Sequence, residues 1–255
     1  MFDLLPPELL ELVVEEVWER PARENLAYSC KAIYKVMKPY LWHDLELQTG
    51  DYGYSYHQEN ILNNKHFIKD LTLRFNREDI QNLCDFLRMI FDGDSVNLSD
   101  LFIQGSVPDD IFSMLMSKST QLRKLDFHIY SEDFQWDHKD LLLPSTLKHL
   151  QLYESSVTDA FVESIISANI ETLEYLDISM CNLVTPKGYL PISKLVNLKY
   201  LTFVEEKPNK ILDVSFISEL RNLEYLNFQG LKIVDDSHIG IWKCVPNLTE
   251  LYVAC

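Results

Sequence analysis

Basic residues are scarce in this 255-residue sequence. Its 23 lysines and arginines stand against 39 aspartates and glutamates, which gives a formal net charge of −16. Nucleic acids and anionic membranes both attract basic protein surfaces, because their phosphates are negatively charged. The charge balance therefore argues against a nucleic-acid or membrane partner, and it is compatible with a soluble acidic protein or with a basic partner protein.

Long apolar runs are also missing. No stretch approaches the roughly 18 apolar residues of a membrane span, and Asp3 and Glu8 interrupt the N-terminus where a secretory signal would be basic and then continuously apolar. The five cysteines are an odd number spread along the chain, and no two form a CxxC pair. This usage is typical of reduced thiols, so we expect a cytoplasmic or nuclear protein, or one found in both.

Catalytic signatures are absent as well. The sequence contains no GxSxG, P-loop, GxGxxG or HExxH motif. The seven histidines are scattered, and only His128 and His149 fall on neighbouring predicted strands. No cysteine or histidine spacing gathers four metal ligands. The sequence thus predicts a protein that is not an enzyme and that has no metal site or cofactor.

A repeated pattern of leucines dominates what is present. Segments such as LEYLDI and LKYLTF recur at intervals of 24 to 30 residues, mostly 25, and a weaker copy, WHDLEL, precedes the other eight. The pattern L-x-x-L-x-L-x-x-[N/C]-x-L at this period is typical of leucine-rich repeats. The central leucines of the nine copies are Leu45, Leu71, Leu101, Leu125, Leu150, Leu176, Leu201, Leu226 and Leu251.

The spacing of the leucines explains how such a repeat folds. The L-x-L residues form a short strand whose alternate side chains point inward, and stacked copies bury this face together. Segments 77–91 and 158–169 place apolar residues on one helical face and close the opposite side, whereas 131–146 has no periodic face. We therefore predict an α/β fold in which residues 43–255 form eight or nine repeats of about 25 residues, wound as a right-handed solenoid with a concave parallel sheet.

Cysteines recur beside the repeats. The position after the strand must be small, buried and able to form a weak hydrogen bond to a neighbouring loop, which suits Asn or Cys. Cys181 and Cys255 follow a strand and Cys244 precedes one in C-V-P-N-L, in two segments that both begin with (V/I)-x-D. These segments resemble the cysteine-containing class of leucine-rich repeats.

Residues 1–42 contain none of the repeat. A helix is predicted after Pro6 and Pro7, with apolar residues from Leu9 to Trp18 covering more than the single stripe of a surface helix. A segment of about 40 residues cannot bury so wide a band by itself. Part of this helix is therefore expected to contact another surface. One or two further short helices are predicted up to Trp42.

Three motifs in this segment are similar to an F-box. They are L-P-x-E-L-L-x-x-V at 5–13, S-C-K at 29–31 and L-W at 41–42, although Ser29 and Ile33 stand where the family usually has Val and Trp. An F-box at 1–42 followed by cysteine-type repeats resembles the F-box/leucine-rich-repeat family over the full chain. Residues 20–38 also have a net charge of +4 within an acidic chain.

This resemblance implies a function. Members of the family are substrate-recognition subunits of SCF-type cullin–RING ubiquitin ligases: the F-box docks on the acidic Skp-family linker, which connects it indirectly to the cullin, and the repeats bind the protein substrate. An alternative is an interaction scaffold whose degenerate F-box does not deliver substrates for ubiquitylation. The candidate linker-binding residues are Leu5, Pro6, Leu9, Leu10, Val13, Tyr40, Leu41 and Trp42.

The concave face of the predicted sheet is the candidate substrate surface. Residues on either side of each central leucine point to this face, so Tyr175, Tyr200 and Tyr225 should form a stacked row across strands about 4.8 Å apart. Tyrosine is common in binding hot spots, although stacked tyrosines can also simply stabilise a sheet. The candidate substrate-binding residues are Tyr153, Tyr175, Asp177, Tyr200, Tyr225, Asn227 and Tyr252.

Overall fold

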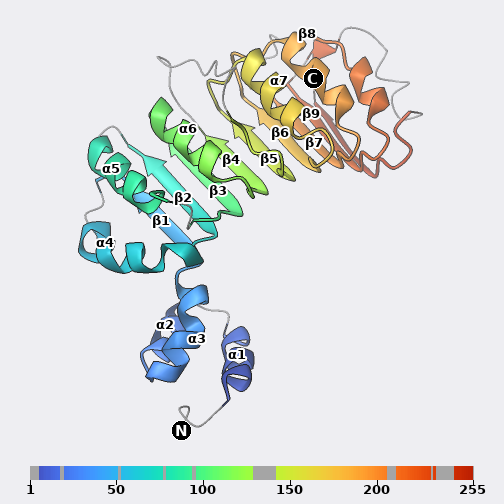
Figure 1. Ribbon diagram of the computed structural model, residues 1–255. Coiled ribbons are helices and arrows are strands. Elements are labelled where there is room, and N and C mark those ends of the chain that lie inside the picture. Colours follow the sequence, from blue (N-terminus) through green and yellow to red (C-terminus); the bar gives the residue numbers. More distant parts are fainter. Residues whose placement is uncertain are drawn as a thin grey trace.

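The computed structural model describes residues 6–17, 20–50, 53–76, 79–93, 96–128, 142–205, 211–230, 232–233 and 244–254. It is a mixed α/β structure built on one sheet of nine parallel strands, which lie side by side in sequence order along an arc (Figure 1). The strands are β1 (Asp44–Gln48), β2 (Asp70–Phe75), β3 (Asp100–Gly105), β4 (Lys124–His128), β5 (His149–Tyr153), β6 (Tyr175–Ser179), β7 (Tyr200–Val204), β9 (Tyr225–Gln229) and β11 (Glu250–Ala254).

The predicted alignment of the repeats is confirmed by the register of the sheet. Every central leucine pairs with the central leucine of the next strand, from Leu45 opposite Leu71 to Leu226 opposite Leu251. The weakest copy of the pattern, around Leu45, therefore forms a regular strand. Parallel neighbours need a crossover connection. Within each interval of about 25 residues the chain must therefore leave the carboxyl end of one strand and return to the amino end of the next.

The crossovers cover one face of the sheet. The helices α5 (Ile80–Ile90), α6 (Asp109–Lys118) and α7 (Asp159–Ala168) lie along its outer side (Figure 1). Farther along the chain the 3-10 helices η3 (Pro186–Lys194) and η4 (Ser215–Glu219) take their place. The predicted helical faces in 77–91 and 158–169 are confirmed, because the apolar residues of α5 and α7 are buried against the strands. We call the opposite side of the sheet the open face.

Side-chain hydrogen bonds join neighbouring turns. Cys181 is fully buried and its Sγ lies 3.1 Å from the carbonyl oxygen of Leu152, as predicted for a small residue at this turn. Asn197, Asn222 and Asn247 recur every 25 residues, and each donates its side-chain amide to a backbone carbonyl of the preceding turn at 2.7–3.0 Å. These bonds satisfy backbone groups that the short crossovers would otherwise leave unpaired.

Three helices precede the sheet and form their own small core. They are α1 (Pro7–Glu15), α2 (Arg20–Ala27) and α3 (Lys31–Leu41). Cys30 begins α3 as an N-cap, since its Sγ accepts a hydrogen bond from the backbone N–H of Ile33 at 3.4 Å. The buried residues of this helical segment are Leu10, Val14, Ala27, Ile33 and Met37, and they form a cluster separate from the core under the sheet.

Some elements were not predicted. They include the helix α4 (Gly53–Asn64), the short 3-10 turn η2 (Lys65–Phe67), and a two-stranded sheet of β8 (Ile211–Leu212) and β10 (Lys232–Ile233). The predicted irregular connection at 131–146 lies mostly outside the described residues. Among the helices in the described ranges, none is long and apolar enough to cross a membrane.

Candidate binding surfaces

The helix α1 exposes part of its apolar band. The side chains of Leu9, Leu12 and Val13 are 47%, 58% and 36% exposed, whereas Leu10 and Val14 are 2% and 1% exposed and pack into the helical core. The expectation that this helix has more apolar surface than its own segment can bury is confirmed. Leu9 and Leu10 are both candidate linker-binding residues, but they lie on different faces of the helix: Leu9 is on the surface and Leu10 is part of the helical core.

The other predicted linker-binding residues also differ in their exposure and in the core against which they pack. Pro6 is exposed at the start of α1, and Leu5 lies outside the described residues. Tyr40 and Leu41 are half-buried against the helical core. Trp42 packs instead against the core under the sheet. Among these residues Pro6 is therefore on the surface. Tyr40 and Leu41 contribute to the helical core, and Trp42, which follows them, contacts the core under the sheet.

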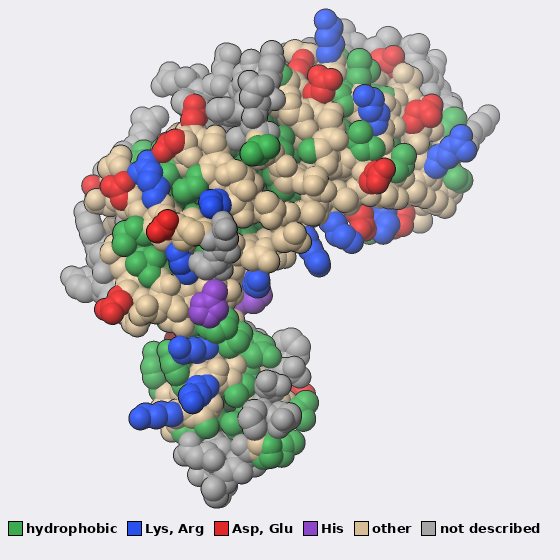
Figure 2. All heavy atoms as spheres, in the orientation of Figure 1, with side chains coloured by type: hydrophobic (Ala, Val, Ile, Leu, Met, Phe, Trp, Pro, Cys, Tyr) green, Lys and Arg blue, Asp and Glu red, His purple; other side chains and the backbone are tan. Residues whose placement is uncertain are grey.

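Basic side chains lie on the same helical segment. Lys31 and Lys35 on α3 are exposed, and Lys38 lies 5.6 Å from the centre of the Tyr34 ring. Figure 2 shows Lys and Arg side chains together with hydrophobic ones on this part of the molecule. The helical segment therefore exposes both apolar and positive groups in a chain with a net charge of −16.

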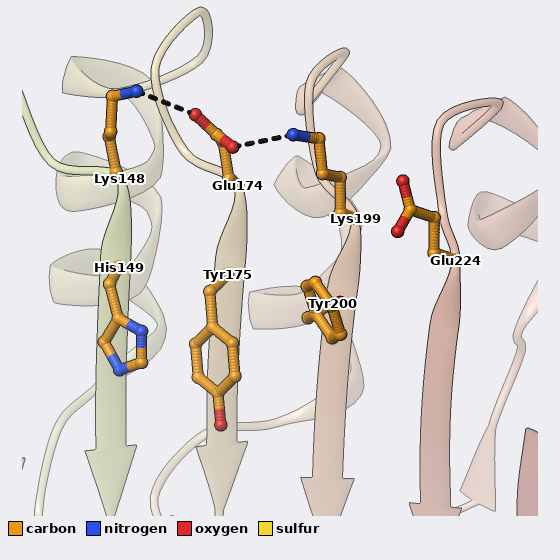
Figure 3. Close-up of a pocket in the computed structure, with 7 residues that line it drawn as sticks. All are labelled: Lys148, His149, Glu174, Tyr175, Lys199, Tyr200 and Glu224. Atoms are coloured by element: carbon orange, nitrogen blue, oxygen red, sulfur yellow. Dashed lines mark hydrogen bonds and ion pairs between the residues drawn. The ribbon is translucent and has the colours of Figure 1, made fainter. Parts of the chain in front are cut away.

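The predicted tyrosine row is present on the open face. Tyr175 pairs with Tyr200, and Tyr200 with Tyr225, across consecutive strands. The ring centres are 6.1 and 5.9 Å apart, and Tyr200 is 41% exposed. His149 extends the row, with its ring stacked on Tyr175 at 3.9 Å (Figure 3). We call these four residues the aromatic row.

The two remaining predicted tyrosines differ in their position relative to the aromatic row. Tyr252 is 47% exposed and its ring centre is 5.5 Å from that of Tyr225. Tyr153 lies farther along its strand and contacts His128, with ring centres 5.3 Å apart. His128 and His149 therefore lie at opposite ends of their strands, each packed against a different tyrosine.

A line of alternating charges follows the amino-terminal ends of the same strands. It consists of Lys148, Glu174, Lys199 and Glu224, and we call it the charge ladder (Figure 3). Glu174 accepts from Lys148 at 3.0 Å and from Lys199 at 2.8 Å, and the bonds from Lys199 and then Lys148 lower its pKa. Together with His149, Tyr175 and Tyr200, the ladder lines a shallow hollow of about 460 Å³.

Asp177 does not present its carboxylate to a partner, which corrects its place in the predicted substrate surface. It faces the open side but is only 7% exposed, and it accepts a hydrogen bond from the hydroxyl of Ser179. Burial raises its pKa to about 6, while the Ser179 bond and the nearby His149 oppose this rise and the charge of Asp126 adds to it. The carboxylate is part of the sheet's own packing.

Asn227 is half-buried between its neighbours. Its side-chain oxygen is inaccessible to solvent and has no hydrogen-bond partner among the described residues. It lies opposite Thr202 and Tyr252 in the register. An unsatisfied oxygen of this kind favours a bound donor, but only a small part of the side chain is on the surface.

Two arrangements on the open face were missed by sequence reasoning. The Nε2 atom of His149 lies 3.1 Å from a carboxylate oxygen of Asp126. Burial works against it, but hydrogen bonds from His149 and Lys124 lower the pKa of Asp126. The charge ladder was also missed. Both follow from the register, because aligning the repeats places Lys124 beside His149 and Lys148 beside Glu174.

One cluster has the residue types of a metal site. The ligand atoms of His43, Asp44 and Asp70 lie within 4.8 Å of one another. Burial, and then a hydrogen bond with Asp100, raises the pKa of Asp70 to about 6. However, His43 already bonds Asp44 at 2.7 Å, and all three side chains are more than one-third exposed. These contacts are those of a surface hydrogen-bonded group.

No protein-family model matches the chain, and a search of curated proteins gave no significant match.

Proposed function

We propose that this protein is the substrate-recognition subunit of an SCF-type cullin–RING ubiquitin ligase. In this proposal residues 1–42 are an F-box that docks on a Skp-family linker, and residues 43–255 are a leucine-rich-repeat solenoid that binds the protein substrate. The observation that supports it best is the exposed apolar face of α1, formed by Leu9, Leu12 and Val13 beside a helical core of its own.

Exposed apolar side chains grouped on one helix indicate a contact site, since single ones are common but clusters are not. The group here belongs to the segment with the L-P-x-E-L-L-x-x-V motif. Lys31 and Lys35, exposed on α3 of the same segment, add positive charge, which suits an acidic linker. Three features of one short segment, namely motif, apolar face and charge, thus favour the same partner.

The sheet supports the second half of the proposal. Nine parallel strands in strict sequence order, repeating at intervals of about 25 residues with crossovers on one face, are what a leucine-rich-repeat solenoid requires. Crossovers between parallel strands are almost always right-handed. Such a fold leaves the open face available for a partner, and there the aromatic row is the most prominent group.

In this role the chain contributes no bond-making chemistry. Holding the substrate near a conjugating enzyme raises the effective concentration of its lysines at that enzyme. The helical segment would fix the chain on the ligase and the open face would hold the substrate. A scaffold with a degenerate F-box would use the same two surfaces but would not bring the cullin.

Co-purification tests this proposal. We expect the chain to capture the linker together with the cullin, whereas a scaffold captures the linker alone or neither. Substituting Leu9→Ala with Val13→Ala should weaken linker binding by about 100-fold or more, because central apolar contacts dominate such interfaces. Leu190→Ala is a control, since Leu190 is 56% exposed but lies on η3, a crossover of the sheet outside the helical segment. Unchanged linker binding by the Leu9 and Val13 variant would contradict the proposal.

A further inference from the structure

We propose that the open face recognises a basic segment of the protein substrate, with an arginine or lysine side chain placed over Tyr225 between the carboxylates of Glu224 and Glu250. This inference rests on the proposed function for its biological meaning. The binding chemistry that it names belongs to the surface itself and can be tested without the ligase.

The first observation is an imbalance in the charge ladder. The carboxylate of Glu174 forms two ion pairs, with Lys148 at 3.0 Å and with Lys199 at 2.8 Å. The next acidic residues, Glu224 and Glu250, have no ion pair with any basic side chain in the described part of the chain. Glu224 acts electrostatically on Lys199, but that lysine is already bonded to Glu174. The charges at β5, β6 and β7 are therefore paired, and the carboxylates of Glu224 and Glu250 at β9 and β11 have no ion pair among the described residues.

The second observation is where these two carboxylates lie. Glu224 immediately precedes Tyr225, and Glu250 lies opposite Tyr225 on the next strand. The backbone N–H of Glu250 donates to the carbonyl of Glu224 at 3.1 Å, so the two residues are direct neighbours. An incoming cation would meet an aromatic ring and two acidic groups at one place.

The aromatic rings on the open face are also farther apart toward β9 and β11 than at β5 and β6. His149 and Tyr175 are closely stacked at 3.9 Å and nearly parallel, which leaves no room between them. The rings of Tyr200, Tyr225 and Tyr252 are instead 5.5 to 5.9 Å apart and tilted, and Tyr200 and Tyr252 are 41% and 47% exposed. Tyrosine faces attract cations within about 6 Å.

The open face already contains this chemistry in a complete form. On the first three strands the guanidinium of Arg74 lies 5.3 Å from the centre of the Phe102 ring, and its Nε donates to Glu46 at 2.8 Å. At the other end of the sheet the ring and the carboxylates are present, and no described basic side chain joins them. We infer that the partner supplies it.

An acidic segment would fit poorly at this end. The lysines of the ladder, Lys148 and Lys199, are already paired with Glu174, and a partner carboxylate would face Glu224 and Glu250. The net charge of −16 also favours the approach of a basic partner and makes its association salt-dependent.

Fluorescence anisotropy with the isolated chain tests the inference. The probe is a labelled peptide of four Gly-Ser-Arg units, compared with matched peptides that contain Glu or Gln in place of Arg. We expect the Arg peptide to bind at least tenfold more tightly than the Gln peptide, and the Glu peptide to bind weakest. Substituting Glu224→Gln with Glu250→Gln should weaken binding of the Arg peptide by at least tenfold.

A second double variant separates a built site from general attraction. Glu163→Gln with Glu171→Gln removes the same charge from exposed positions elsewhere, and it should change the affinity less than twofold. An equal loss in both double variants, or equal binding of the Arg and Gln peptides, would overturn the inference. Linker capture, measured separately on the same proteins, should be unchanged throughout, so its failure would count against the proposed function alone.

Discussion

The helical segment and the sheet bury their apolar residues very differently. Among the described residues of the helical segment five buried side chains form the core, and Leu9, Leu12 and Val13 remain on the surface of α1. Under the sheet a continuous core extends from Leu47 to Val245, with most of its side chains completely buried. The helical segment therefore leaves apolar side chains exposed, whereas each repeat of the sheet buries its apolar side chains against the next repeat.

This difference shows where each region needs a partner. A small helical core contributes little stability, because so short a segment removes little apolar surface from water. Covering α1 with another protein would therefore stabilise the segment as well as bind it. The sheet needs no such help, so its open face can vary in chemistry, and there exposed rings and charges replace apolar area.

Among the substitutions that test this comparison, the largest loss of stability is expected in the sheet core. Phe161 is fully buried on α7 and forms a cluster with Phe112 and Phe127, whose ring centres are 6.2 and 6.3 Å away. Phe161→Ala should lower the free energy of unfolding by about 3–5 kcal/mol. Denaturant unfolding followed by circular dichroism measures this loss.

The matched change in the helical segment is Leu12→Ala. Leu12 is 58% exposed, so its truncation should cost under about 0.5 kcal/mol in the isolated chain. A cost for Leu12→Ala that approaches the Phe161 value would show that α1 is already covered within the chain.

An effect smaller than that of Phe161→Ala, and of opposite sign, is expected from the buried carboxylate on the open face. The pKa of Asp177 is raised from 3.8 to about 6 by burial, so between these values the folded chain holds a proton that the unfolded chain has lost. Stability therefore falls as the pH rises through this window, and the penalty persists at pH 7. Asp177→Asn should remove the penalty and raise the unfolding free energy at pH 7 by about 1–3 kcal/mol.

Asp126 provides a control of opposite sign. Its pKa is lowered despite burial, through bonds from His149 and Lys124, so it contributes stability above its ordinary pKa that is lost as the pH falls. Asp126→Asn should destabilise the chain at pH 7. Thermal unfolding of both variants at pH 7 and pH 5 measures the contrast, and an Asp177 variant with wild-type stability at pH 7 would refute the assignment.

Much of the sheet could be predicted because the repeat is a strict local rule. Once the leucines are aligned, period-two alternation fixes which side chains face the core, and the tyrosine row follows from the register alone. The helix α4 and the pairing of β8 with β10 could not be predicted, since the crossovers that contain them do not repeat the pattern.

The candidate surfaces were predictable in position but not in exposure. The apolar band of α1 is visible in the sequence, but whether Leu9 or Leu10 faces solvent depends on how α1 packs on α3. Likewise Asp177 occupies a surface position in the register, yet its neighbours cover it to 7% exposure. Burial of this kind is set by side chains on adjacent strands, which one repeat does not specify.

Hydrogen exchange with and without the Skp-family linker tests the central claim most directly. The account predicts that the linker slows exchange in residues 7–15 and in α3, while β6, β7 and β9 exchange at the same rate in both samples. Protection of these strands by the linker, or no change in 7–15 when the linker is bound, would contradict the assignment of the helical segment as the docking surface and of the open face as a separate one.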